Sequence, residues 1–449
     1  MKHLNLLRRL SMHWHQQEST HGSIARSFVL VAMYVLIGKI AGAVKEILSA
    51  RHFGTSSEMD AFLFVFNLVS WPVGISLALL SALLVPLYAR LGDTQPPALS
   101  RFRSEVHGFV ICIGIALGAL FSVLLSIDLF LVHLSGLSTD SANAARHFAW
   151  PLAVLIPVGI YGALLSVESL AQQSHLNTLL EGVPAIIVCV ALLLWTNLTV
   201  ALLVWATLAG FLCQTLLLHI TQSRRGSLPP VRLGFSSDHW RPIRNGLLAM
   251  ALAQTLQSLT TLIDQFWAAR ISEGAISTMG YAQRVLFLIL GLTMTAIGRA
   301  TLPVFSRLTV SEEPASLRVM TQWSTLLFVL GLAIAAVLWP LTPWIMGSLF
   351  ERGAFTHADT AATASFIRYG LLQLPFYFAI IVFMQWMLAA KLYTAVAWIA
   401  FFNLLLKLLA NALLAPFLGL DGLALATSIM YAGSALMIML ALRFKMLAP

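Results

Sequence analysis

The stretch GKIAGAVKEILSARHFGTSSEMDAF at residues 38–62 decides the fold class, because it places charged side chains directly after an apolar run. The preceding residues, FVLVAMYVLI at 28–37, have the character of the first half of a membrane helix. A charge at membrane depth is costly, so it usually has a partner, a water-filled cavity or a ligand. Lys39, Lys45 and Glu46 therefore mark a candidate functional site inside a membrane-spanning segment.

The composition is that of an integral membrane protein built from helices. Hydrophobic residues make up 59% of the chain and charged residues only 10%, whereas a soluble domain carries about 25% charged residues. Long apolar runs indicate helices rather than the short alternating strands of a membrane barrel. The net charge of +9 fits basic cytoplasmic loops, so we expect no nucleic-acid partner. The three scattered cysteines predict neither a disulfide framework nor a metal site.

The apolar runs predict about twelve transmembrane helices, because a helix needs about 20 mainly apolar residues to cross a bilayer. We expect them at roughly 24–50, 59–90, 104–134, 143–171, 176–197, 199–222, 242–271, 276–307, 319–348, 360–390, 394–417 and 421–444. The polar stretch SRRGSLPPVRLGFSSDHWRPIRN at 223–245 separates them into two lobes of about six helices, an arrangement that suits an alternating-access transporter. The expected N-lobe is 24–222, the linker is 223–241 and the C-lobe is 242–449.

The distribution of Lys and Arg predicts that both termini are cytoplasmic. The outer side then carries only Arg51, Arg146, Arg270 and Arg352. Residues 1–23 are basic and partly amphipathic, without the long apolar region of a cleaved signal peptide. We expect them to form a cytoplasmic segment that lies on the membrane surface.

Three charges, Lys39, Lys45 and Glu46, lie in the second half of the first predicted helix. Lys39 and Glu46 are seven residues apart and therefore share one helix face. Lys45 lies about 100° round the helix from Glu46. Gly38 and Gly42 permit the close approach of another helix. The positions of Lys39 and Lys45 favour side chains that line a cavity, and an internal salt bridge or snorkelling to the interface are the alternatives.

A polar stripe follows one face of the predicted helix at 242–271. It consists of Gln254, Gln257, Thr261 and Asp264. Hydrogen bonding between packed helices explains some stripes of this kind. A stripe that ends in an acid favours a hydrated cavity.

Further polar side chains lie at membrane depth in the second half of the chain. Arg284 is about two turns inside its predicted helix. Asn403, Lys407 and Asn411 are spaced four residues apart, with Lys407 near the bilayer centre. Lys407 is either a binding or ion-coupling residue or a lysine neutralised by burial. Asp60 is either an ordinary residue of the outer rim or a member of the cavity.

The intramembrane charges have an excess of positive sign, which predicts an anionic substrate. Phosphate or diphosphate is the natural choice, because Arg and Lys bind it strongly. The sequence has no Walker A, GxSxG or HExxH motif, so we expect a transporter rather than an enzyme, with no cofactor and no metal.

Three motifs in order resemble the MurJ/MviN family of lipid II flippases. The first is the opening stretch quoted above, in which Lys39 and Lys45 stand where the family has arginines. The second is MGYAQRVLFLILGLTMTAIGRATLPVFSRL at 279–308, which places Arg284 on a family arginine. The third is LFERGAFTHADT at 349–360. The family usually has fourteen helices, whereas we expect this chain to have about twelve.

The resemblance implies an all-helical, V-shaped alternating-access transporter in the bacterial inner membrane. A central cavity would bind the diphosphate of lipid II or a related polyprenyl-diphosphate-linked saccharide, through Lys39, Lys45 and Arg284. Membrane lipid would hold the polyprenyl tail, and a membrane potential, a proton or a monovalent ion would drive transport. The candidates for lining the cavity or for ion coupling are Glu46, Asp60, Asp264, Gln257, Asn403 and Lys407.

Three other functions remain open at this point. An exporter of an exopolysaccharide or O-antigen-type repeat unit would use the same diphosphate chemistry. A multidrug or cation antiporter predicts a cavity dominated by acids, and the sequence shows the opposite sign. A non-transporting membrane scaffold predicts that the intramembrane cations are dispensable. Enzymes of glycan synthesis are candidate partners for either glycan transporter.

Overall fold

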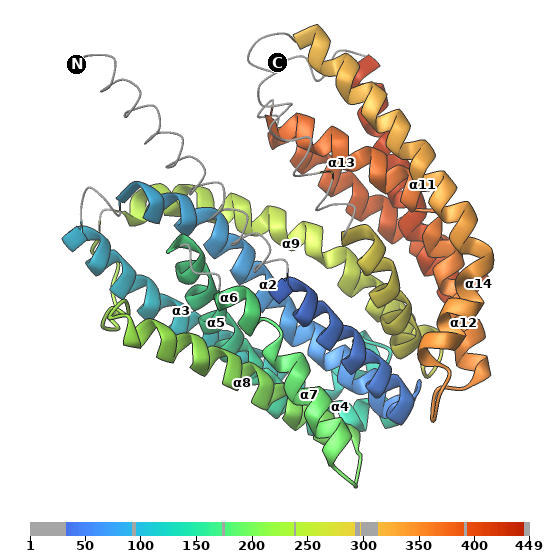
Figure 1. Ribbon diagram of the computed structural model, residues 1–449, viewed down its shortest axis with the longest axis horizontal. Helices are drawn as coiled ribbons and strands as arrows, with labels where there is room; N and C mark the ends of the chain where they lie inside the picture. Colours follow the sequence, from blue (N-terminus) through green and yellow to red (C-terminus); the bar gives the residue numbers. More distant parts are fainter. Residues whose placement is uncertain are drawn as a thin grey trace, which may run out of the picture.

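The computed structural model describes residues 33–91, 96–172, 176–237, 239–291, 297, 313–389 and 393–443. These residues form helices and connecting loops, with no β-strand among them (Figure 1). Eight of the described helices are long and apolar enough to cross a membrane, or nine if α12 and α13 form one bent span. The all-helical, multi-pass class is thereby confirmed, whereas the number of about twelve spans stays a prediction.

The N-terminal bundle begins with a helix described over residues 33–53. It continues with α2 (Ser57–Leu91), α3 (Pro96–Leu124), a π-helix (Leu129–Leu134), α4 (Thr139–Ala153), α5 (Leu155–Ala171), α6 (Leu176–Leu180), α7 (Val183–Leu194) and α8 (Val200–Arg224). Helix α2 packs against α4 and α5, α3 packs against α5, and α7 packs against α8. The predicted span at 104–134 was wrong at its C-terminal end, because α3 stops at Leu124 and a separate π-helix follows it.

The C-terminal bundle contains α9 (Trp240–Ile271), a helix over Ala275–Gly291, α11 (Glu313–Phe350), α12 (His357–Leu371), α13 (Leu374–Ala389) and α14 (Tyr393–Arg443). Within α14 the chain reverses at Gly419, whose φ of 56° lies in the left-handed region that glycine adopts readily. The two halves, Ala395–Leu418 and Leu420–Leu440, confirm the last two predicted spans. The predicted span at 360–390 is α12 and α13, which meet at a bend of 45°.

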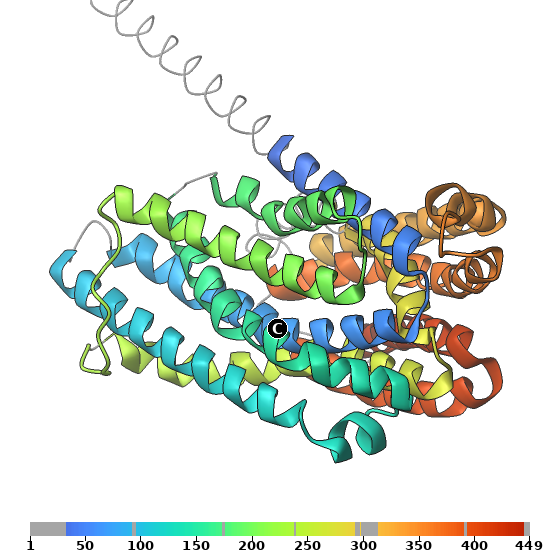
Figure 2. The same ribbon diagram turned by 90° about the horizontal axis from the view of Figure 1, so that it is seen from below.

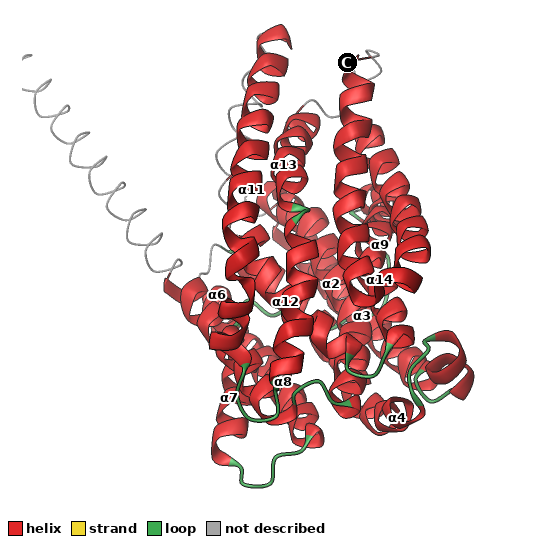
Figure 3. Cartoon of the chain, turned by 90° about the vertical axis from the view of Figure 1, so that its right-hand side faces the viewer, coloured by secondary structure: helices red, strands yellow, loops and turns green. Residues whose placement is uncertain are grey.

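The two bundles approach each other at one end and diverge toward the other, which gives the molecule a V shape (Figure 1). Figure 3 shows the helices of both bundles running roughly along one direction, with the loops at their ends. We call the end where the bundles meet the contact end; it carries residues 51–60, 134–138, 271–277 and 351–357. The opposite end is the far end. Along their length, the bundles also touch through α2 and α9.

Some sequence features lie outside the described residues. They include the segment 1–23 and most of 292–312, which contains the second part of the motif at 279–308. The exact boundaries of the two lobes and the linker stay a prediction, although the packing divides the described helices into the same two groups.

Candidate functional site

Two cations from different bundles share one carboxylate where the bundles meet. Lys45 Nζ lies 2.9 Å from Glu46 Oε1, and Arg284 Nε lies 3.2 Å from the same oxygen. Glu46 and Lys45 come from the helix at 33–53, whereas Arg284 comes from the helix over Ala275–Gly291. The structure thus brings together three of the residues that the sequence singled out. We call them the interbundle cluster.

The interbundle cluster is positively charged and partly accessible. Its two cations face a single anion, so one positive charge lacks a counter-charge within the cluster. The side chain of Arg284 is 45% exposed and that of Lys45 is 21% exposed, while Glu46 is buried at 10%. An accessible guanidinium next to an ammonium can bind a phosphate group, with the guanidinium providing paired donors.

Lys39 lies apart from the interbundle cluster. It is six residues before Lys45 on the same helix, a rise of about 9 Å, and its side chain is exposed. Its charge interacts with that of Glu181. Gly38 beside it packs directly against Gly182, where an added Cβ would lie 3.1 Å from the Gly38 Cα. This close approach fixes the first helix against the start of α7.

Asp60 fastens the bundles at the contact end. One of its carboxylate oxygens accepts from the Gly274 N–H at 2.7 Å, and the other accepts from the Ser277 N–H at 2.8 Å and the Ser277 hydroxyl at 2.7 Å. A carboxylate at a helix N-terminus satisfies unpaired N–H groups and complements the helix dipole. That helix also carries Arg284, so Asp60 fixes the start of the helix on which Arg284 lies. A role for Asp60 in lining the cavity or in ion coupling stays a prediction. The sequence gives no local signal for this pairing.

Backbone contacts complete this fastening. The hydroxyl of Tyr281 donates to the Gly54 carbonyl at 3.1 Å, and the Ala354 N–H donates to the Arg51 carbonyl at 2.8 Å. The Arg270 guanidinium donates to the Leu134 carbonyl at 2.6 Å. The contact end is therefore held by hydrogen bonds to backbone groups as well as by charge.

A second charged cluster lies wholly inside the C-terminal bundle. Lys407 Nζ lies 2.9 Å from Asp264 Oδ1, and it donates to the Leu423 carbonyl and the Thr427 hydroxyl. The Asn411 amide donates to Asp264 at 2.8 Å. Both ionic side chains are buried, at 1% and 8% exposure. We call these residues the C-bundle cluster.

The C-bundle cluster borders a cavity of about 90 Å³. Thr261, Gln373 and Tyr431 contribute polar groups to its lining. Asn403 lies elsewhere on α14 and accepts a hydrogen bond from Ser434. The side chain of Gln257 lies outside the described part of the chain. Among the described residues, no group of three or more His, Cys, Asp or Glu side chains is placed to hold a metal ion.

The sequence prediction missed a third group of charges, in the N-terminal bundle. Arg103 forms a two-point ion pair with Glu168, at 3.0 and 2.9 Å. Glu105 accepts from Ser237 and Trp240 in the linker. Arg103 and Glu105 both lie on α3 near a polar loop. Charged residues are expected where a helix meets the membrane surface, so the sequence did not mark these two as members of a site.

Together, the apolar spans, the two diverging helix bundles and the charged cluster between them define a membrane transporter of the two-lobed class. A family model described as lipid II flippase MurJ matches residues 49–447. The chain therefore belongs to the lipid II flippase MurJ family.

Individual relatives agree with this assignment. The chain is 30% identical over 176 residues to the probable lipid II flippase MurJ of Bdellovibrio bacteriovorus, covering 37% of this chain and 32% of that protein. It is 22% identical over 440 residues to the lipid II flippase MurJ of Burkholderia cenocepacia, covering 94% and 84%.

Solved structures share the fold. A lipid II flippase MurJ in an inward closed conformation matches with a TM-score of 0.80 at 20% identity, covering 92% of this chain and 87% of that one. An inward-facing multidrug resistance transporter of the MATE family matches with a TM-score of 0.65 at 13% identity, covering 92% and 94%.

Proposed function

We propose that the protein flips lipid II or a related polyprenyl-diphosphate-linked saccharide from the cytoplasmic to the outer leaflet of the bacterial inner membrane. Such a substrate serves cell-wall or cell-surface glycan synthesis. The observation that carries the proposal is the interbundle cluster, in which Lys45 and Arg284 share the single carboxylate of Glu46. Membership of the lipid II flippase MurJ family supports the same conclusion.

The cluster supports a binding step by exchange of anions. In this structure Glu46 is the anion that keeps two cations of like charge together. A diphosphate carries more negative charge than one carboxylate, so it is a stronger partner for the same pair. Arg284 is accessible enough to meet it first. Lys39, one and a half turns or more away, would contact the more distant part of the headgroup.

The proposed orientation places both termini in the cytoplasm and the contact end outside. The basic residues support it, because the contact end carries the few arginines predicted for the outer side, including Arg51, Arg270 and Arg352. The far end carries a larger group, which includes Arg101, Arg103, Arg224, Arg225 and Arg232. The structure would then be closed toward the outside. Opening would break the bonds of Asp60 to the helix over Ala275–Gly291 and separate Arg284 from Glu46.

We place energy coupling, to a proton or a monovalent ion, at the C-bundle cluster. Lys407 and Asp264 form a buried ion pair beside a cavity, and neither belongs to the interbundle cluster. Helix α9 carries Asp264 and also touches α2, so in this proposal a change of charge at the pair would act on the N-terminal bundle through α9. Enzymes of glycan synthesis are the proposed cellular partners.

The other functions fit the structure less well. A cation antiporter needs excess negative charge between the lobes, whereas the interbundle cluster has excess positive charge. A scaffold gives no reason for an accessible arginine between the two bundles. An exporter of another diphosphate-linked repeat unit uses the same chemistry and is distinguished only by its glycan.

The test is lipid flipping by purified protein in liposomes, together with complementation of a flippase-depleted strain. The variants Lys45→Ala and Arg284→Ala each remove one cationic hydrogen-bond donor to the diphosphate. A hydrogen bond of this charged kind contributes about 1.5–3 kcal/mol. We expect flipping to fall about 10- to 100-fold. Arg318→Ala is the matched control, because Arg318 is an exposed arginine on α11.

The results of these two assays distinguish the candidate functions. Wild-type flipping by both variants at equal expression would refute the proposed site. Flipping of a polyprenyl-diphosphate-linked repeat unit but not of lipid II would move the proposal to the other glycan. Uptake of organic cations without lipid flipping would favour the antiporter.

A further inference from the structure

The linker between the bundles runs along α3 and is hydrogen-bonded to it. Figure 2 shows it crossing the far end of the N-terminal bundle between α8 and α9. Arg103 donates to the Ser227 carbonyl at 2.7 Å, and the Arg232 N–H donates to the Ser104 carbonyl at 3.1 Å. We call residues 227–237 the strap.

The end of the strap is held by one carboxylate. Glu105 accepts from the Ser236 N–H at 3.2 Å, the Ser237 N–H at 3.1 Å and the Trp240 indole at 2.7 Å. The indole ring also packs edge-on against Phe109. The strap is therefore fastened at its start, middle and end.

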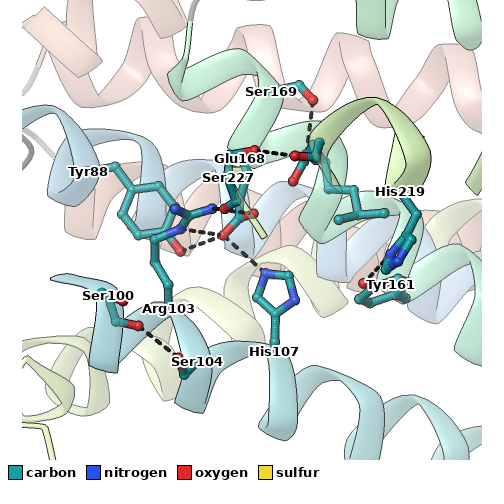
Figure 4. Close-up of polar contacts among 12 residues, drawn as sticks. Tyr88, Ser100, Arg103, Ser104, His107, Tyr161, Glu168, Ser169, His219 and Ser227 are labelled. Atoms are coloured by element: carbon teal, nitrogen blue, oxygen red, sulfur yellow. Dashed lines mark hydrogen bonds and ion pairs between the residues drawn. The ribbon is translucent and has the colours of Figure 1, made fainter. Parts of the chain in front are cut away.

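The fastening stands on a rigid base, which Figure 4 shows. Arg103 is fixed by its two-point pair with Glu168, which is 1% exposed. His107 lies 3.2 Å from the same carboxylate, and the Tyr88 hydroxyl lies 3.5 Å from it. Because these groups come from α2, α3 and α5, the strap is tied to the body of the bundle.

The middle of the strap lies directly on the α3 backbone. A Cβ added to Gly108 would lie 2.1 Å from the Arg232 carbonyl oxygen, so only glycine permits this contact. The side chains of Leu233 and Phe235 also touch α3, at Gly108 and Phe109 respectively, so that part of each lies against the helix.

Three large apolar side chains of the strap are nevertheless mostly exposed. Val231 is 55% exposed, Leu233 is 77% exposed and Phe235 is 64% exposed. Residues 231–236 have no helical or turn structure, and every one of them is exposed. Three large apolar side chains held toward water would be unfavourable, which indicates that something covers them.

Basic residues surround this apolar row. Arg224 and Arg225 precede the strap, Arg232 lies within it, and Arg101 lies beside it on α3; all four are exposed. Arg101 is additionally tied to the strap by a hydrogen bond to Ser236. Apolar side chains flanked by arginines match the headgroup boundary of a bilayer with anionic lipids.

We propose that the strap is a membrane-surface anchor. Val231, Leu233 and Phe235 insert at the boundary between headgroups and acyl chains, and the arginines bind the phosphates of anionic lipids. The position of the strap supports a lipid surface as the partner that covers it, because the strap lies where the membrane span of α8 ends and that of α3 begins. The anchor holds the beginning of α9 at the membrane surface through Trp240.

The test measures the depth of spin labels in full-length protein in vesicles. Cys112, Cys189 and Cys213 are replaced by Ala, and a label is attached after Leu233→Cys or Phe235→Cys. Collisions with oxygen report lipid, and collisions with a water-soluble nickel complex report water. Leu409→Cys on α14 is the lipid control, and His357→Cys, 88% exposed, is the water control.

We expect both strap labels to favour oxygen, as Leu409→Cys does. Replacing phosphatidylglycerol by phosphatidylcholine, or combining Arg225→Gln with Arg232→Gln, should raise nickel access to the strap labels. Nickel access equal to that of His357→Cys would overturn the proposal. Shielding from both reagents would also overturn it, because a protein surface would then cover the strap.

Discussion

Removing the Asp60 carboxylate should loosen the contact end. Asp60→Ala deletes the acceptor of two backbone N–H groups and one hydroxyl, all of them buried. Leaving one buried donor without a partner costs about 1–3 kcal/mol, so the closed arrangement should lose about 3 kcal/mol. That loss lowers the ratio of closed to open molecules about 150-fold.

Electron-spin distance measurements between the bundles test this expectation. Labels at Asp140 on α4 and His357 on α12 are exposed and lie near the contact end in different bundles. Asp60→Ala should broaden and lengthen the distance, and Asp60→Asn should have an intermediate effect because it keeps one acceptor oxygen. Glu58→Ala, which removes an exposed acid two residues away, is the control. An unchanged distance in Asp60→Ala, with normal helix content, would refute the reasoning.

Two more predictions concern contacts that do not cross between the bundles. Gly108→Ala should displace Arg232 and the rest of the strap from α3 and speed amide hydrogen exchange in the strap, whereas Gly74→Ala, with open space around it, should not. Equal exchange in both variants would contradict the close contact. Lys407→Met should lower stability by about 3–5 kcal/mol, because it leaves the Asp264 carboxylate buried and unpaired. Thermal unfolding in detergent measures this, and adding Asp264→Asn should recover part of the loss.

The sequence predicted the membrane spans well because hydropathy depends mainly on local composition. The two halves of α14 were expected at 394–417 and 421–444, and they lie at Ala395–Leu418 and Leu420–Leu440. The bend between α12 and α13 was not predicted. The two residues at the bend, Leu372 and Gln373, add only one polar side chain to a long apolar run, so hydropathy shows one continuous span. Hydropathy measures how apolar a segment is and carries no information about its direction.

The site was predicted in part for a similar reason. The charges of Lys45, Glu46 and Arg284 stand out in apolar sequence, so they could be identified one by one. Their shared ion pair joins residues more than 200 positions apart, and only the packing of the bundles brings them together. The partners of Asp60 are backbone N–H groups of a distant turn, and every residue type except proline supplies such a group.

The exposure of the three main ion pairs indicates which one changes during transport. Arg103–Glu168 and Lys407–Asp264 each lie within one bundle and have at least one member that is 1% exposed. Breaking a buried pair costs about 3–5 kcal/mol, which favours bundles that move as rigid bodies.

The pair between the bundles differs from these two. The side chain of Arg284 is 45% exposed, and a pair with one solvated partner contributes only about 0–1 kcal/mol. In the proposed binding step, Arg284 would therefore exchange Glu46 for a diphosphate without the loss that the internal pairs would suffer. Under the proposed function, exchange at this least buried of the three pairs would alter the contact between the bundles and so would couple substrate binding to their relative motion.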